Sequence, residues 1–413
     1  MHVVIIGNGI AGINVASALS SAEGVSVEVF GAEQSPFYSR VRLPEVLSGT
    51  STAESIIFYK SEWYEKKKIQ VHCASRVASI DREGKKIVLD TGEAHSYDYL
   101  VLATGAFSNK PSIPGVDLPG IFTLRTIDDV ASIRRHIASR DATGSRSSTA
   151  SVIGGGLLGL EAARALKDSG VEKVRVLEQY PTLLSRQLDE TGGCLLRKHL
   201  ETMGLEVLCG VETVRLEDGS IVLKDGRSIE SDTTILSMGV RPETGLAKAA
   251  ALTVNRGIVV DNHLKTNDPF IYAVGDCAEF EGVVWGIIPA ALEQAPVAAR
   301  AILASANIIP PEQATAYVQT VPKTALKVGG IEMMSLGKAI LSAEEKNSEK
   351  YETVSKVWDD TDRYEKFVLE FREGQSVLAG AILYGSKLHQ SRVQKMMGQP
   401  VSRAEIEGLL AEQ

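Results

Sequence analysis

The apolar positions of the chain change their spacing along its length, and the spacing predicts both strands and helices. Residues 3–6 and 151–153 are short apolar runs typical of buried parallel strands, and each leads into an alanine- and leucine-rich segment with helical periodicity. Between them, residues 69–103 alternate apolar and polar positions around turn signals, which predicts a β-meander ending in a buried strand at 99–103. We therefore expect a mixed α/β protein.

Both predicted strand-to-helix junctions carry the glycine spacing GxGxxG. The first glycine permits a tight turn, the second lets a pyrophosphate approach the backbone, and the third lets the helix pack close to the strand. The helix N-terminus then directs its amide groups, with their partial positive charge, at the phosphates. The spacing predicts two dinucleotide sites, formed by Gly7, Gly9 and Gly12 and by Gly154, Gly156 and Gly159.

An acidic residue ends the second strand of each predicted unit. Glu33 follows the apolar run "VSVEVF", and Glu178 follows "KVRVL". An acid about 20 residues after the glycines accepts hydrogen bonds from ribose hydroxyls in such units. A solvent-exposed loop carboxylate is the alternative for either residue. The agreement of glycine turn, helix and strand end in both copies favours the ribose role.

The composition is that of an ordinary globular chain. It has 413 residues, of which 44% are hydrophobic and 23% charged, with a formal net charge of −8. The length suits two or three domains, and the acidic balance argues against nucleic acid as the main partner. No apolar run approaches the roughly 18 residues of a membrane span. The apolar N-terminus carries the glycine pattern and no preceding Lys or Arg, so we expect no export signal and a cytoplasmic location.

The cysteines and histidines show no metal-ligand spacing, and we expect no metal site. The histidines are scattered along the chain, and none has the sequence context of a catalytic residue. A structural disulfide is unfavourable in a reducing compartment, so we interpret the cysteines as small buried residues. These are Cys73, Cys194, Cys209 and Cys277.

Turn signals and composition divide the chain into four segments, with a proline-rich boundary at "SNKPSIPGVDLPG". We expect the first dinucleotide domain to comprise residues 1–111 and 237–311, with the second nested between them at 112–236. The last hundred residues change character and predict a small α+β domain at 312–413. Within it, residues 342–352 are polar and predict a solvated loop.

A later strand end supports the nested arrangement. The stretch "TNDPFIYAVGDCAEF" ends a predicted strand at Gly275 and Asp276, where a carboxylate could bind the ribityl hydroxyl of a flavin. The helical segment "IIPAALEQAPVAARAIL" follows and could direct its N-terminus at the flavin ring. A turn or N-cap role is the alternative for Asp276.

Five motifs in this order resemble those of the pyridine nucleotide–disulfide oxidoreductase superfamily: "GNGIAG", "ATG", "GGGLLG", "GVRP" and "IYAVGD". The resemblance covers residues 1–310. Within the superfamily, "GAEQSPFYSRVRLPEVLSG" and "TALKVGGIEMMSLG" are similar to NADH:rubredoxin reductases and to the flavin domain of assimilatory nitrite reductases. The resemblance implies two Rossmann-like domains, with FAD in the first site and NAD(P)H in the second.

The resemblance also implies roles for individual residues. Glu33 would bind the adenosine ribose of FAD, Arg40 would meet its pyrophosphate, and Asp276 would hold its ribityl chain. Further implied cofactor contacts are Val77, Ala103, Thr104, Gly105, Arg125 and Gly275, and, in the second unit, Leu158 and Gly239.

Glu178 predicts a preference for NADH over NADPH. Its carboxylate would accept from both ribose hydroxyls of NADH and repel the 2′-phosphate of NADPH. The next residues, Gln179 and Tyr180, supply no cation, although Arg175 or Arg186 could fold back toward the phosphate.

The loop after the first site departs from the disulfide reductases of the superfamily. They carry CxxxxC on the following helix, and peroxide- or coenzyme-A-linked relatives carry one cysteine, but "YSRVRLPEVL" has none. A thiol relay is therefore disfavoured, and direct transfer to a carrier is favoured. Glu45, Glu161 and Lys327 are candidate neighbours of the flavin, with a helix first-turn acid as the alternative for Glu161.

We therefore expect an FAD-dependent NADH oxidoreductase that passes electrons to a carrier protein, rubredoxin before others, without a redox-active disulfide. The alternatives are an electron-input subunit of a nitrite or other reductase complex, a ferredoxin reductase, and a redox-sensing flavoprotein. A homo-oligomer is an open alternative to a monomer.

Overall fold

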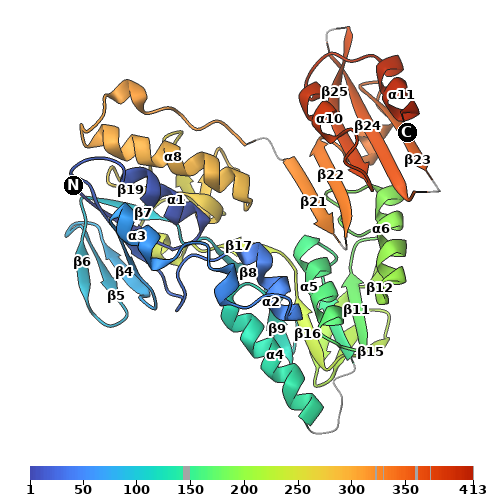
Figure 1. The fold of residues 1–413 in the computed structure, drawn as a ribbon, viewed down its shortest axis with the longest axis horizontal. Helices are drawn as coiled ribbons and strands as arrows, with labels where there is room; N and C mark the ends of the chain where they lie inside the picture. Colours follow the sequence, from blue (N-terminus) through green and yellow to red (C-terminus); the bar gives the residue numbers. More distant parts are fainter. Residues whose placement is uncertain (143–148, 321–322, 329, 359–360, 373, 413) are drawn as a thin grey trace. The chain divides into compact units, whose positions relative to one another are not determined.

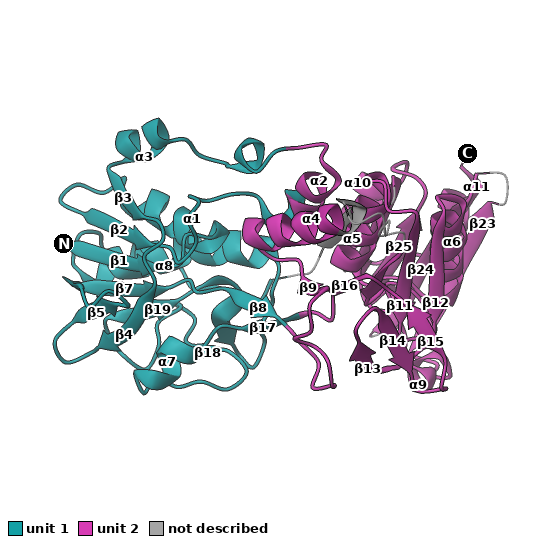
Figure 2. Ribbon diagram, turned by 90° about the horizontal axis from the view of Figure 1, so that it is seen from below, with its two compact units in different colours: residues 1–42, 52–108, 240–320 teal, residues 43–51, 109–239, 321–413 magenta. Residues whose placement is uncertain are grey.

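The computed structural model describes residues 1–142, 149–320, 323–328, 330–358, 361–372 and 374–412. The chain divides into two compact units, each assembled from separate segments (Figure 2). Unit 1 comprises residues 1–42, 52–108 and 240–320, and unit 2 comprises residues 43–51, 109–239 and 321–413. The finer division at residues 112, 237 and 312 stays a prediction.

Unit 1 is built on a five-stranded parallel sheet with the strand order β19–β7–β1–β2–β3. Its central strands are apolar on both faces, which is typical of a parallel sheet covered by other elements. Helix α1 packs against β1, β2 and α8 (Figure 1). The strands are β1 (His2–Ile6), β2 (Ser26–Phe30), β3 (Ile69–His72), β7 (Tyr99–Leu102) and β19 (Ile271–Ala273), and the two helices are α1 (Ile10–Leu19) and α8 (Ile288–Ser305).

The rest of unit 1 consists of small antiparallel and parallel strand groups and short helices. The meander predicted over residues 69–103 is confirmed only for its middle, the antiparallel sheet β4 (Val77–Asp81), β5 (Lys86–Leu89) and β6 (Ala94–Ser96). Its first and last strands, β3 and β7, pair instead in the parallel sheet. Strands β8 (Ala106–Ser108) and β17 (Val240–Pro242) pair antiparallel, and β18 (Ile258–Val260) pairs parallel with β20 (Ala278–Phe280). The short helices are η1 (Arg40–Arg42), η2 (Glu54–Ile56), α3 (Ser61–Lys67), α7 (Gly245–Ala249), η3 (Gly275–Cys277) and η4 (Pro311–Gln313).

The parallel sheet of unit 2 repeats the arrangement of unit 1, with the order β12–β11–β10–β16–β9. In each sheet the strand that leads into the glycine loop, β1 or β10, is central. The next two strands of the sheet follow it on one side, β2 and β3 in unit 1 and β11 and β12 in unit 2. Two doubly wound sheets of this kind confirm the predicted fold class. The strands are β9 (Ile121–Thr123), β10 (Thr149–Ile153), β11 (Lys173–Glu178), β12 (Leu205–Cys209) and β16 (Thr233–Leu236).

Helices and a small meander complete this half of unit 2. Helix α2 packs against α4 and α5. The helices are α2 (Leu43–Ser48), α4 (Ile127–Ala142), α5 (Leu157–Asp168) and α6 (Glu190–Thr202), and the meander is β13 (Thr213–Glu217), β14 (Ser220–Leu223) and β15 (Ser228–Glu230). None of the helices within the described ranges is long and apolar enough to cross a membrane.

The C-terminal part of unit 2 is an antiparallel sheet with the order β21–β22–β25–β24–β23 and three helices. The polar segment predicted as a loop contains a short helix, because Ser342 and Glu345 form a reciprocal capping box at its start. The strands are β21 (Lys323–Val328), β22 (Ile331–Gly337), β23 (Tyr351–Trp358), β24 (Arg363–Arg372) and β25 (Gln375–Tyr384), and the helices are α9 (Ala343–Lys346), α10 (Gln390–Met396) and α11 (Arg403–Ala411).

Candidate functional site

The first glycine loop joins β1 to α1, and its three glycines have three different surroundings. Gly7 has a φ of +114°, and a Cβ added there would lie 2.0 Å from the carbonyl oxygen of Ala103. A Cβ on Gly12 would lie 2.0 Å from the carbonyl oxygen of Gly7, whereas a Cβ on Gly9 would meet nothing within 4 Å. The packing of the protein itself requires Gly7 and Gly12, while Gly9 borders open space.

The second glycine loop, between β10 and α5, repeats this division. Gly154 has a φ of +120°, and its Cβ would lie 2.2 Å from the carbonyl oxygen of Ser237. A Cβ on Gly159 would lie 2.0 Å from the oxygen of Gly154, and a Cβ on Gly156 would meet nothing within 4 Å. In each loop the middle glycine of the GxGxxG spacing is the one at which no neighbouring protein atom would clash with a side chain.

Gly9 and Gly156 are the N-cap residues of α1 and α5, and neither helix has an acidic residue in its first turn. The amides at these helix N-termini therefore carry their partial positive charge without a competing carboxylate nearby in the sequence. An open approach to the backbone, combined with such a helix end, fits a dinucleotide pyrophosphate at each loop.

Glu33, the acid after β2, lies in a cluster with two residues of the following loop. Its carboxylate accepts hydrogen bonds from the Tyr38 hydroxyl and the Arg40 guanidinium, and Arg40 Nη1 also donates to the Tyr38 oxygen at 2.8 Å. Burial disfavours the charged form of Arg40 and would lower its pKa. The electrostatic interactions with Tyr38, Glu33 and Asp276 outweigh burial, so the pKa of Arg40 is raised. The structure thus joins the two residues expected to meet the ribose and the pyrophosphate of FAD.

Glu178, the last residue of β11, is buried, with 8% of its surface exposed. Its Oε2 accepts from the backbone N–H of Gly155 at 2.6 Å, and its Oε1 accepts from the N–H of Tyr180 at 2.8 Å. An ionised carboxylate has further lone pairs for ribose hydroxyls, so this anchoring is compatible with the expected role. Glu178 therefore also fixes the glycine loop of its own site, which the sequence did not suggest.

The two arginines considered as partners for a 2′-phosphate have different surroundings. Arg175 is buried, and it donates from Nε to Glu206 at 2.9 Å and from Nη1 to the carbonyl oxygen of Glu230 at 2.6 Å. These bonds hold it in place, so the expectation that it could fold back is wrong. Arg186 is exposed on the segment between β11 and α6.

The "ATG" and "GD" segments are each tied to a neighbouring part of unit 1. Thr104 Oγ1 donates to the carbonyl oxygen of Glu243 at 2.7 Å, and the Glu243 N–H donates to the Gly105 oxygen at 2.9 Å. The Gly275 N–H donates to Oε1 of Gln294 at 2.7 Å. Gln294 is a buried residue of α8 that sequence reasoning missed, because a glutamine inside a helical pattern has no distinguishing signal.

The remaining predicted cofactor contacts occupy varied positions. Val77 is buried at the start of β4, and Arg125 precedes α4 in unit 2, where its backbone N–H donates to Asp129 at 2.8 Å. Leu158 is 37% exposed in the first turn of α5, and Gly239 has a φ of +81° with nothing within 4 Å of an added Cβ.

The candidate flavin neighbours belong to unit 2. Glu45 lies in α2 and accepts from the Ser51 hydroxyl at 2.8 Å, and Glu161 lies in α5, which packs against α2. Since α5 begins at Leu157 and has no acid in its first turn, Glu161 is not the first-turn acid of the alternative interpretation. Lys327 is part of β21, and its side chain lies outside the described part of the chain.

All four cysteines are free thiols. Cys277 is fully buried, and burial raises the pKa of its thiol, in keeping with a small core residue. Cys73 and Cys209 are partly buried, with their pKa values also raised by burial, but Cys194 is exposed on α6, so the expectation of burial is wrong for it. The exposed face of α6 at this position explains the difference, since a residue there need not pack against the sheet.

Residues 1–301 match the family model described as pyridine nucleotide-disulphide oxidoreductase. The chain belongs to this family. The match covers well over half of the chain, and it confirms the family assignment suggested by the five motifs. FAD and NAD(P)H are the cofactors that membership implies, and both glycine loops fit them.

Curated relatives of this chain fall into two groups by length. A nitrite reductase [NAD(P)H] from Bacillus subtilis is 35% identical over 403 residues, covering 96% of this chain and 47% of the relative. The chain thus spans about half the length of the nitrite reductase relatives it matches. An NADH-rubredoxin oxidoreductase from Clostridium acetobutylicum is 32% identical over 337 residues, covering 81% of each chain.

Two solved reductase structures share the fold of this chain over nearly its whole length. The NADH:rubredoxin oxidoreductase from Clostridium acetobutylicum has 27% sequence identity and a TM-score of 0.74, covering 96% of this chain and 93% of that one. A ferredoxin reductase from Rhodopseudomonas palustris has 26% identity and a TM-score of 0.81, covering 97% and 96%. The fold of these two reductases therefore matches that of this chain over nearly its whole length.

Proposed function

We propose that this chain takes electrons from NADH and passes them to a small carrier protein, with FAD at the Gly7–Gly12 loop and NADH at the Gly154–Gly159 loop. The observation that carries the proposal is the open space at Gly9 and Gly156, in loops whose other glycines are packed against backbone. A chain with two such sites can bind a flavin and a nicotinamide nucleotide together. FAD, when bound, accepts a hydride and can release electrons singly.

The residues of unit 1 have the chemistry to hold FAD. The N-terminal amides of α1 and the permanently charged Arg40 favour a pyrophosphate, and Glu33 offers carboxylate oxygens to a ribose. Asp276 lies in η3, which the Gly275–Gln294 hydrogen bond ties to α8, and it offers a carboxylate to the ribityl chain. We propose that residues 1–111 and 237–311 form the FAD domain.

We propose residues 112–236 as the NADH domain, with Glu178 as the residue that selects NADH over NADPH. Two anions about 4 Å apart repel by about 4 kcal/mol at an effective dielectric near 20. Partial exposure and salt reduce this, so we expect a preference of about ten- to a thousand-fold. The ion pair of the buried Arg175 with Glu206 supports the preference, because it removes one candidate cation for the 2′-phosphate.

We propose rubredoxin as the first candidate acceptor. The supporting observation is the similarity to NADH-rubredoxin oxidoreductase over four-fifths of both chains, together with a loop after the first site that contains no cysteine. A second candidate, electron input to a nitrite reductase, is supported by 35% identity over 96% of this chain to one part of a longer nitrite reductase.

The test is steady-state turnover of the FAD-loaded protein with NADH and three acceptors: oxidised rubredoxin, a plant-type ferredoxin and ferricyanide. We expect fast ferricyanide reduction and a higher kcat/KM for rubredoxin than for ferredoxin. Fast ferricyanide reduction with neither carrier protein reduced would refute the carrier proposal and favour the reductase-complex function. Slow reduction of every acceptor would refute electron transfer as the function and favour the sensing alternative.

A further inference from the structure

Strand β24 begins with four consecutive polar residues that are all buried. The exposed fractions are 7% for Arg363, 2% for Tyr364, 1% for Glu365 and 6% for Lys366. Successive side chains of a strand point to opposite faces of the sheet, so the four residues form two pairs with different surroundings.

One pair is satisfied within the C-terminal part of the chain. Arg363 donates to Glu365 from Nε at 3.0 Å and from Nη2 at 2.8 Å. Nδ1 of His389, the N-cap residue of α10, lies 2.9 Å from the other oxygen of Glu365. These contacts join the strand to its own helix and involve no residue of the nucleotide-binding half.

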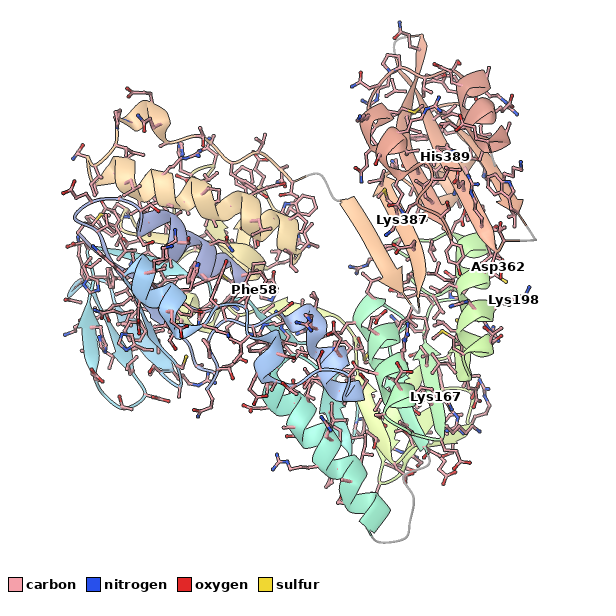
Figure 3. All side chains as sticks on the ribbon, viewed as in Figure 1. Phe58, Lys167, Lys198, Asp362, Lys387 and His389 are labelled. Carbon is pink, nitrogen blue, oxygen red and sulfur yellow. The ribbon has the colours of Figure 1, made fainter. Side chains whose placement is uncertain are left out.

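The other pair contacts a single carboxylate in the nucleotide-binding half of unit 2. The Tyr364 hydroxyl donates to Oδ2 of Asp189 at 2.7 Å, and Lys366 Nζ donates to the same oxygen at 2.9 Å. Asp189 is the N-cap residue of α6, and its Oδ1 accepts from the Gly192 N–H at 3.1 Å. Figure 3 shows α6, which carries Lys198, beside Asp362, the residue that precedes β24.

The contact of Lys366 with Asp189 differs from a surface ion pair because the lysine side chain is buried. A buried lysine ammonium loses its hydration and is strongly unfavourable unless an anion compensates it, and Asp189 is the anion that meets Lys366. Burial alone would raise the pKa of Asp189, but the hydrogen bonds from Tyr364 and Lys366 outweigh burial and lower it.

Asp189 ends the segment that follows Glu178, which we call the ribose loop, residues 179–189. Its middle is held to the second glycine loop, because the Leu184 N–H donates to the carbonyl oxygen of Gly155 at 3.1 Å. The Leu183 side chain also packs there, and a Cβ on Gly155 would lie only 2.6 Å from it. The ribose loop is thus fixed to the glycine loop in its middle and to the C-terminal sheet at its end.

We propose that the C-terminal sheet positions the NAD(P)H site, with Tyr364 and Lys366 acting through Asp189 to hold the ribose loop in the conformation that binds nucleotide. The proposal rests on the proposed NAD(P)H site at Gly154–Glu178. Tyr364 and Lys366 are positioning residues, since both contact Asp189 and the nucleotide site lies at the other end of the ribose loop. The C-terminal sheet then has a role in nucleotide affinity separate from any role in binding an acceptor.

The test uses the FAD-loaded full chain with both tethers replaced by apolar side chains of similar size, Tyr364→Phe with Lys366→Met. Removing them leaves Asp189 able to cap α6 but frees the end of the ribose loop. We expect the KM for NADH and the Kd for NAD⁺ to rise about five- to fifty-fold, with kcat within about two-fold of wild type and FAD content unchanged. Hydrogen–deuterium exchange of residues 180–188 should become faster.

The matched control is Lys350→Met, which removes the ion pair of an exposed lysine with Glu370 of the same sheet. It should change neither the KM nor the exchange of the ribose loop. If the double variant does not fold, Tyr364→Phe alone, which removes one hydroxyl, should raise the KM about two- to five-fold.

Unchanged exchange of residues 180–188 in the folded double variant would overturn the proposal, as would faster exchange with an unchanged KM. Because exchange is measured without nucleotide, it tests the tether even if the wild type binds no NADH. Failure of the wild type to bind NADH would instead refute the proposed nucleotide site and, with it, the effect of the tether on affinity.

Discussion

Replacing Gly9 or Gly156 with alanine adds one methyl group at the N-cap of α1 or α5. The backbone accepts this, because φ is −91° at Gly9 and −81° at Gly156, and an ideal Cβ at either position meets nothing within 4 Å. Alanine restricts the unfolded chain, which stabilises by about 0.4–1 kcal/mol. It is also a poorer N-cap than glycine by a similar amount. The free energy of unfolding should therefore change by less than about 1 kcal/mol.

The methyl group would stand where a pyrophosphate must approach the backbone. Each hydrogen bond from a backbone amide to a charged phosphate contributes about 1.5–3 kcal/mol. Losing one such bond weakens binding roughly ten- to two-hundred-fold, since each 1.4 kcal/mol corresponds to about ten-fold. Because the two loops have the same geometry, we expect the same loss at each, but for different cofactors.

The assay measures both cofactors on each variant. Gly9→Ala should lose FAD on dialysis, seen as loss of the visible flavin absorption, while its Kd for NAD⁺ stays near that of the wild type. Gly156→Ala should keep FAD and show the raised Kd. Gly12→Ala is the control for a packed glycine, because its Cβ would lie 2.0 Å from the Gly7 oxygen and should prevent folding. Retention of both cofactors by both folded alanine variants would refute the assignment of the loops.

Three further predictions follow from the described contacts. Changing all four cysteines to serine should leave NADH-dependent ferricyanide reduction within a few-fold of wild type, and loss of hydride transfer in a folded, FAD-loaded variant would reveal a redox thiol. Glu178→Ala should weaken the binding of NADH more than the binding of NADPH, and Glu178→Arg should reverse the preference in kcat/KM. Equal kcat/KM values for the two nucleotides in the wild type would contradict this role of Glu178. Burial and the charge of Asp268 raise the pKa of Tyr97 to about 12, so the folded state keeps the phenol neutral while the unfolded chain ionises near its ordinary value of about 10. Stability should be retained below about pH 10 and lost as the pH rises to about 12, and urea unfolding of Tyr97→Phe should show a smaller loss over that range.

The sequence was informative where function depends on local geometry. A tight turn, a close approach and a helix start lie within a few residues of one another, so the glycine spacing alone predicted both loops. The side-chain partners of the site were not predictable in this way. Glu33 meets Arg40, and Gly275 meets Gln294, through the folding of loops and helices that no residue spacing records.

The histidines illustrate the same limit. They are scattered in the sequence, yet His2, His72 and His95 all have a ring nitrogen within 3.5 Å of the Glu28 carboxylate. Parallel pairing of β1, β2 and β3 brings the first two beside Glu28, and the meander adds the third. No group of residues in the described ranges fits a metal ion, and the cluster is a packing feature of the sheet.

The order of strands in unit 1 has a consequence for synthesis on the ribosome. Strand β7 pairs with β19, but the chain between Leu102 and Ile271 must be translated first. At about 5–20 residues per second this takes roughly ten to thirty seconds. During that time the buried residues Leu100, Val101 and Leu102 form an unpaired apolar edge on the nascent sheet. The nested topology therefore leaves one edge of β7 without its partner strand until β19 has been made.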